Sequence, residues 1–183
     1  MKVEVVRSRR RTLCASVKDG VLTVRAPLFS SDADIARFLE KHRAAIDKLA
    51  KRAEQFEREK AAVRKLSTSE IDALYEKARA VVPERVAHFA PLVGVTYGRI
   101  TIRRQRSRWG SCSSKGNLGF NCLLMLTPPE VIDSVVVHEL CHRKEMNHSR
   151  RFYAEVLRVF PDYRKADKWL KENGKLILAS VEE

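Results

Sequence analysis

The stretch V-V-V-H-E-L-C-H at residues 135–142 decides the fold expected for this chain. Its two histidines, His138 and His142, stand four residues apart, and Glu139 follows the first of them. The apolar run before them predicts a helix over residues 129–145. Residues i and i+4 share one face of a helix, so both imidazoles can reach a single ion. Zinc, which takes nitrogen ligands in tetrahedral geometry, is the expected ion.

A catalytic zinc site also needs a third protein ligand and one open position. His148 is the preferred third ligand, although six residues on a continuous helix turn by about 600°, well off the ligand face. The helix must therefore end before His148 and bend back at Met146-Asn147, since Asn tolerates the left-handed conformation at a helix end. Glu155, on the next expected helix, is the alternative ligand. Glu139 would not ligate, and we expect it to act as general base on a metal-bound water.

The N-terminal part combines strand and helix signals. The first 28 residues are rich in valine and leucine, and Asp19-Gly20 is a two-residue hairpin signal. An apolar series at steps of three and four residues then predicts one long amphipathic helix from about Ser31 to about Lys65. We expect residues 1–66 to form a β-hairpin followed by this helix.

Residues 67–183 are expected to form the region that carries the histidines, as one compact unit. Ser67 and Glu70 match a capping box that opens a helix, and Pro83 should kink or break it. Strands and helices are segregated rather than alternating, so the expected fold class is α+β with a small antiparallel sheet. The expected strands are 95–102, 108–112 and 118–124, and the expected further helices are 149–159 and 163–173.

The most unusual feature of the composition is its large excess of basic residues. Its 183 residues include 36 Lys and Arg against 23 Asp and Glu, a net charge of +13. Residues 99–116 contain six basic side chains and no acidic one. A basic surface attracts polyanions, nucleic acid above all, although it can also serve solubility alone. Helix-turn-helix and zinc-finger patterns are absent from the sequence, so any nucleic-acid binding is expected to be non-specific.

Other features of the sequence bear on the location of the protein and on the state of its cysteines. No apolar run approaches the roughly 20 residues of a membrane span, so no membrane partner is expected. The first residues lack the apolar core of a signal peptide, which favours the cytoplasm. The four cysteines have no C-x-x-C spacing and are expected to be reduced thiols. Packing is the expected role of Cys112 and Cys141.

A longer pattern surrounds the two histidines. The segments R-W-G-S-C-S-S-K-G-N-L-G-F-N at 108–121, V-V-V-H-E-L-C-H at 135–142 and M-N-H-S-R-R-F at 146–152 resemble the YgjP-like family of metal-dependent hydrolases. That family is grouped with the SprT-like and other minimal zincin peptidases. The segments R-S-R-R-R-T-L at 7–13 and D-G-V-L-T-V-R-A-P at 19–27 resemble it as well.

The resemblance implies a zincin-like fold and a divalent metal, expected to be Zn²⁺. Its ligands would be His138, His142 and His148, and its general base would be Glu139. The chain departs from the family pattern at Ser134, where an aromatic residue is expected, and at Tyr153, where Trp is expected. Both look like packing positions that affect the shape of the pocket.

The segment 108–121 is the expected place of substrate binding. In zincins a strand above the metal pairs with the substrate backbone, and such β-augmentation gives affinity. A buried core hairpin with no substrate role is the alternative interpretation. The candidate substrate-binding residues are Trp109, Gly110 and Ser111 on a closely approached strand, Asn121 as a partner of a carbonyl or water, and Arg108.

The function favoured by the sequence is a zinc metallopeptidase, in which a zinc-bound water activated by Glu139 attacks a peptide carbonyl. The substrate would be a peptide or protein. A zinc hydrolase of a non-peptide substrate such as a nucleotide phosphoanhydride is one alternative, because guanidinium groups suit phosphate. A DNA-associated protease or binding module is another. Candidate oxyanion stabilisers are Tyr153, Tyr163 and Arg151, and the arginines that suit phosphate are Arg103, Arg104, Arg106 and Arg108. The sequence does not address the oligomeric state.

Overall fold

The computed structural model describes residues 2–18 and 20–181. Contacts between residues divide the chain into two compact units, Met1–Val63 and Arg64–Glu183. Within the described ranges, no helix is both long enough and apolar enough to cross a membrane.

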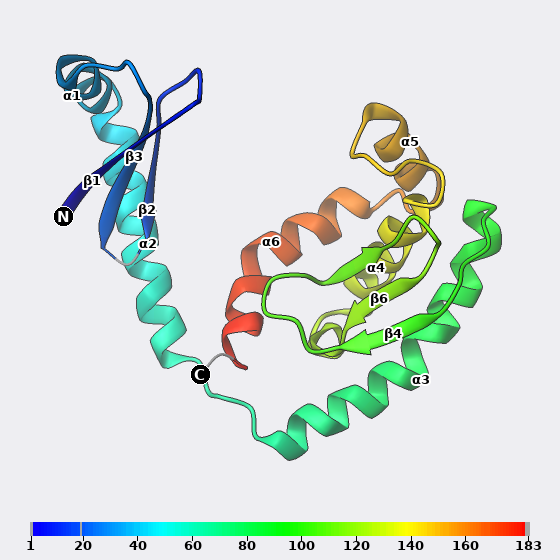
Figure 1. Cartoon of the computed structure of the whole chain (residues 1–183). Coiled ribbons are helices and arrows are strands. Elements are labelled where there is room, and N and C mark those ends of the chain that lie inside the picture. Colours follow the sequence, from blue (N-terminus) through cyan, green and yellow to red (C-terminus); the bar gives the residue numbers. More distant parts are fainter. Residues whose placement is uncertain (1, 19, 182–183) are drawn as a thin grey trace. The chain divides into compact units, whose positions relative to one another are not determined.

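The first unit contains a three-stranded sheet of β1 (Lys2–Ser8), β2 (Cys14–Lys18) and β3 (Val21–Pro27), in the order β1-β3-β2 (Figure 1). β2 and β3 form the expected antiparallel hairpin. Of its turn, Asp19 lies outside the described residues, and Gly20 has a φ of 73°, which favours glycine. β1 pairs parallel to β3, an addition that the hairpin signal does not predict.

The expected long helix of this unit is divided into α1 (Asp32–Lys41) and α2 (Arg43–Ala62), so that prediction is wrong in one respect. The break is at His42, whose backbone leaves the helical region with φ −108° and ψ 15°. Packing explains the break, because Ile35 of α1 and Ile46 of α2 both join the small core that contains Leu22 and Val24 of β3.

The second unit opens with α3 (Thr68–Val93), capped by the reciprocal hydrogen bonds of Ser67 and Glu70 as expected. Of the two expected effects of Pro83, a kink or a break, the break does not occur, since α3 runs through Pro83 to Val93 and is capped by Gly94, whose φ is 77°. A proline removes one hydrogen bond of a helix, and burial of the surrounding face outweighs this loss. The buried residues of that face include Ala78, Val82, Val86 and Phe89.

The sheet of this unit comprises β4 (Ile100–Arg103), β5 (Gly110–Cys112) and β6 (Leu118–Asn121), in the order β4-β6-β5. β5 and β6 form the expected antiparallel pair, but β4 runs parallel to β6, so the sheet is mixed. Residues 95–99, expected as strand, precede β4 as a loop because the pairing starts only where Ile100 meets Leu118. After β6, a 3₁₀ helix (Cys122–Leu126) leads to the central helix.

That central helix is α4 (Pro129–Cys141), which carries the first four residues of the histidine motif and is capped by the fifth, His142. It packs against α3, β5, α5 (Arg150–Val159) and α6 (Tyr163–Ala179), as Figure 1 shows. Val136, Val137 and Leu140 of α4 are fully buried in the core, together with Phe120 and Phe152. A helix buried on most of its surface is rigidly held, and it gives the histidines a fixed platform.

Candidate active site

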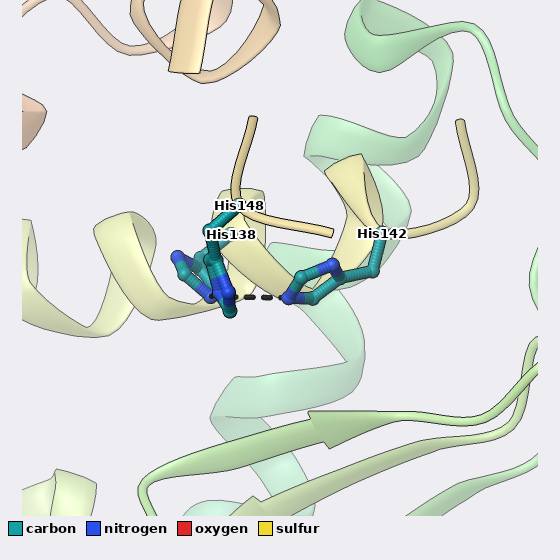
Figure 2. Close-up of side chains that lie close together, drawn as sticks. All are labelled: His138, His142 and His148. Carbon is teal, nitrogen blue, oxygen red and sulfur yellow. Dashed lines mark hydrogen bonds between the residues drawn. The ribbon is translucent and has the colours of Figure 1, made fainter. Parts of the chain in front are cut away.

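Three histidine rings meet at the C-terminal end of α4. His138 lies on the last turn, His142 caps the helix, and His148 comes from the loop before α5. The Nε2 atom of His138 is 3.2 Å from Nε2 of His142 and 3.0 Å from Nε2 of His148. Figure 2 shows these ring nitrogens turned toward one another. All the ligand atoms lie within 4.8 Å of one another, as the spacing of the motif predicts.

The turn that brings His148 back is built by the end of α4. The helix stops at Cys141, earlier than the expected Glu145, and the backbone N–H groups of Lys144 and Glu145 both donate to the carbonyl of Cys141. The chain bends at residues 146–147, where the sequence predicted a bend. Ser149 then caps α5 by accepting from the N–H of Phe152. The early end of the helix is what makes a third histidine ligand possible.

The remaining nitrogen of two rings is held by a neighbour. Nδ1 of His142 lies 3.1 Å from the carbonyl oxygen of Glu145, and because a carbonyl only accepts, this nitrogen carries the proton. Nδ1 of His138 lies 2.9 Å from the hydroxyl of Tyr163. Such partners fix the orientation and tautomer of a ligating imidazole. At His142 this leaves the Nε2 lone pair free for a metal, and Nε2 of His138 lies close to Nε2 of both other rings.

This donor set suits a divalent metal. Nitrogen lone pairs at this separation need a proton or a metal ion between them, and three histidines are a common ligand set of catalytic zinc. Burial lowers the pKa of His138 to about 4, with the neighbouring histidines adding to the effect. Burial also lowers the pKa of His142. Both rings are therefore neutral at pH 7, which is the form that binds a metal.

Glu139 lies beside this cluster and contacts the sheet. It is 6% exposed, and burial raises the pKa of its carboxyl to about 8. A Cβ atom added to Gly110 of β5 would lie 2.5 Å from Oε1 of Glu139. The carboxyl group is therefore packed directly on the backbone of β5, and any side chain at position 110 would displace it.

A cavity of about 230 Å³ opens next to His138 and Glu139. Three of the candidate substrate-binding residues, Arg108, Trp109 and Gly110, line it. The other lining residues come from the preceding turn of α4 and from α6: Ser134, Val135, Tyr163, Asp167 and Leu170. Ser134 and Val135 lie four residues before His138 and Glu139, so helix geometry could have identified them. Of the α6 residues, Tyr163 was a candidate from the sequence, whereas Asp167 and Leu170 have no signal in the sequence that connects them with the motif.

Two candidate residues do not reach the cavity. Asn121 is fully buried, and its Nδ2 donates to the carbonyl oxygens of Gln105 and Arg108 at 2.7 and 2.9 Å. The expectation that it orients substrate is contradicted by these bonds, since its amide instead holds the loop before β5. The Ser111 side chain points toward Gly119 of β6, where an added Cβ would lie 2.7 Å from its Oγ. Ser111 therefore packs beside Gly119 and does not line the cavity.

Glu155, the alternative third ligand, is engaged elsewhere. It forms ion pairs with Lys144 and Arg158, and hydrogen bonds from Arg158 and then Lys144 lower its pKa to about 2. Glu155 lies outside the histidine cluster, which identifies His148 as the better third donor.

The candidate oxyanion stabilisers lie at different places around the cluster. Tyr153 is exposed near His148, with ring centroids 6.2 Å apart, and Arg151 is exposed. The Tyr163 hydroxyl contacts His138.

The cysteines do not join the site. Cys141 is buried in the core, and burial raises the pKa of its thiol to about 12. Cys112 packs on the core from β5, and burial raises the pKa of its thiol as well. Both therefore remain protonated thiols, and their observed role is packing.

The chain is similar to one protein family and to two solved structures. The sequence model of the YgjP-like metallopeptidase domain matches residues 63–173. Two solved zymogens match at 22% identity over 52% of this chain. They are the metallopeptidases abylysin of Pyrococcus abyssi, matched over 97% of its chain with a TM-score of 0.47, and jannalysin of Methanocaldococcus jannaschii, matched over 96% with 0.44. No curated protein matches. Because the family match spans more than half of the sequence, the chain belongs to the YgjP-like metallopeptidase family and is a metal-dependent hydrolase.

Proposed function

We propose that the protein is a zinc-dependent peptidase, with zinc held by Nε2 of His138, His142 and His148. The observation that carries this proposal is the convergence of three ring nitrogens beside a buried carboxyl group. When bound, zinc would polarise the scissile carbonyl and lower the pKa of a water molecule. Glu139 is the general base, which takes a proton from the attacking water at a carboxylate oxygen and later gives it to the leaving amine.

The substrate is proposed to lie along β5. This strand is an edge of the sheet, since in the described part of the chain only β6 pairs with it. A peptide in extended conformation can add to such an edge through main-chain hydrogen bonds. Gly110 then brings the backbone of β5 against Glu139, so a peptide on this strand would pass close to the general base.

Tyr163 is proposed as a positioning residue for His138 rather than as an oxyanion stabiliser. Its hydroxyl oxygen accepts from the Nδ1–H of His138 when Nε2 of that ring binds the metal. This contact leaves Tyr153, which is exposed beside His148, as the better candidate for the oxyanion role.

The test of the function combines metal content with a substrate screen. Elemental analysis should find about one zinc per chain, and a library of internally quenched peptides should be cleaved. The variant Glu139→Gln should keep its zinc and lose about 10²–10⁴-fold in kcat. Nucleoside triphosphates are screened in parallel, because Arg108 lines the cavity. Zinc-dependent turnover of a triphosphate without peptide cleavage would replace the peptidase with the phosphoanhydride alternative.

We also propose that the second unit associates non-specifically with nucleic acid. A groove of about 500 Å³ follows the β4 edge of the sheet and is lined by Arg79, Arg99 and Arg103. Arg79 pairs with Glu76, whereas no carboxylate of the described residues forms an ion pair with Arg99 or Arg103. Unpaired guanidinium groups beside an open strand edge suit a phosphate backbone.

We propose that the protein is located in the cytoplasm, which is a reducing compartment. Support comes from the cysteines, because Cys14, Cys112, Cys122 and Cys141 are all free. Free thiols of this kind are usual where glutathione and thioredoxin keep cysteines reduced.

A further inference from the structure

We propose that the cavity beside Glu139 receives a large apolar side chain next to the scissile bond of the substrate, and that Ser134 sets its depth. The inference rests on the proposed peptidase function and adds the class of side chain that this chain selects.

Three segments of the chain each contribute a large apolar side chain to the lining of the cavity. Trp109 comes from the segment before β5, Val135 from α4 and Leu170 from α6. The indole of Trp109 is held in place, because a Cβ added to Gly174 of α6 would lie 3.0 Å from its Cζ2 atom. The wall is therefore formed before any substrate arrives, and a preorganised pocket loses less entropy on binding.

Ser134 contributes size rather than polarity. It is 2% exposed, and its hydroxyl donates to the carbonyl oxygen of Val131 at 2.8 Å. This hydrogen bond occupies the hydroxyl within the helix, so the side chain presents little more than a methylene group to the cavity. Because it lies one turn before His138, a larger residue at this position would fill the space beside the reacting groups.

The charged groups around the cavity offer a substrate side chain little. Lys171 donates to Oδ2 of Asp167 at 2.5 Å, so this carboxylate already has a counter-ion. Arg108, the basic lining residue, is exposed to solvent, where water screens its attraction for a carboxylate. A charged substrate side chain would therefore lose hydration in exchange for a weak contact, which favours an apolar one.

The volume is sufficient for an aromatic ring. A cavity of about 150 Å³ lined by apolar side chains can bind benzene. The cavity here measures about 230 Å³. Phenylalanine and leucine side chains are therefore the expected occupants.

The test uses zinc-loaded protein and peptides that differ only in the residue flanking the scissile bond, with Phe, Leu, Trp, Ala, Lys or Asp in turn. Wild type should cleave the Phe and Leu peptides at least about tenfold faster, in kcat/KM, than the Ala peptide. Ser134→Phe should abolish or invert this ratio. Leu170→Ala, which enlarges the cavity, should shift the preference toward tryptophan. The matched control is Glu130→Phe, an aromatic addition on the exposed first turn of the same helix.

A binding measurement separates the pocket from the activity. In a Trp169→Phe background, Trp109 is the single tryptophan, and its fluorescence should respond saturably to N-acetyl-phenylalanine amide. Ser134→Phe should remove that response. Saturable binding in a protein that cleaves no peptide would support the pocket and reject the peptidase. Faster cleavage of Lys or Asp peptides, an unchanged preference in Ser134→Phe, or no saturable response would overturn the pocket.

Discussion

The hydroxyl oxygen of Tyr163 lies 2.9 Å from Nδ1 of His138 and thereby joins α6 to the histidine cluster. Tyr163 is itself 8% exposed and starts α6, so this contact is held by the core of the second unit. Its position holds the His138 ring of the proposed zinc site through Nδ1, the nitrogen that does not bind the metal. The same helix supplies Asp167 and Leu170 to the neighbouring cavity, so α6 serves both the metal ligands and the pocket.

Replacing Tyr163 by Phe should weaken zinc binding by about 10–100-fold, the usual cost of losing a partner of a ligating histidine. The ring would stay buried, but Nδ1 of His138 would lose its acceptor. Competition with a fluorescent chelator measures the affinity. Tyr97→Phe, which removes a hydroxyl from an exposed loop residue, is the control and should bind zinc as wild type does. An unchanged affinity in Tyr163→Phe would show that the contact does not hold the ring.

His148→Ala should lose most of its bound zinc, whereas Glu155→Gln should keep about one zinc per chain. Glu155 forms ion pairs with Lys144 and Arg158, so its replacement should reduce stability by roughly 0.2–1 kcal/mol without affecting the metal ligands. Elemental analysis after dialysis measures the zinc content, and a thermal melt measures the change in stability. Zinc loss in Glu155→Gln and retention in His148→Ala would make the carboxylate the third ligand.

The sequence predicted those elements whose signals are local. The spacing of the histidines placed them on one helix face, and the need for a third ligand correctly required a bend before His148. The capping box at Ser67 and the β5–β6 hairpin also appear as expected. Each of these depends on residues within about ten positions of one another.

The features that the sequence did not predict depend on packing between distant segments. α3 passes through Pro83 because its buried face outweighs one lost hydrogen bond. The helix break at His42 follows from the core around β3. In the site, Asn121 is used to hold a loop, and Asp167 and Leu170 lie in the cavity only because α6 folds back on α4. No periodicity or motif in those segments indicates such contacts.

Gly110→Ala should lower kcat/KM by about 10²-fold, because the new methyl group would overlap the Glu139 carboxyl. Overpacking of this kind should also cost about 1–3 kcal/mol of folding stability. The three histidines are not displaced directly, so zinc content should stay near one per chain and serves as the internal control. Full activity of a folded Gly110→Ala enzyme would mean that the contact between β5 and Glu139 is not needed in catalysis.

The unfolding free energy of the metal-free protein should show opposing pH dependences from Glu139 and His138. The folded pKa of Glu139 is raised to about 8, so its contribution is fully present below about pH 4.5 and is lost as the pH rises toward 8. The folded pKa of His138 is lowered to about 4, so its contribution is present above pH 6.5 and is lost as the pH falls toward 4. Urea titrations in the presence of a chelator measure both.

Glu139→Gln isolates the first of these effects. The variant should be more stable than wild type at pH 8 by several kcal/mol and nearly equal to it at pH 4, because glutamine has no charged form to bury. A constant difference between the two proteins across this range would show that the carboxyl group is not desolvated in the folded state.

Replacing both Arg99 and Arg103 by Ala should weaken binding of a short single-stranded oligonucleotide and reduce its dependence on salt. Each phosphate contact contributes about 0.7 to the slope of log K against log salt, so the slope should fall by roughly 1.4. Removing two exposed charges from α2 instead, with Lys48→Ala and Lys51→Ala, is the matched control, because the net charge changes equally. Fluorescence anisotropy at several salt concentrations reads the affinity. Equal losses in the two double variants would mean that the protein attracts polyanions by its net charge alone, and the groove at the β4 edge would then have no specific part in binding.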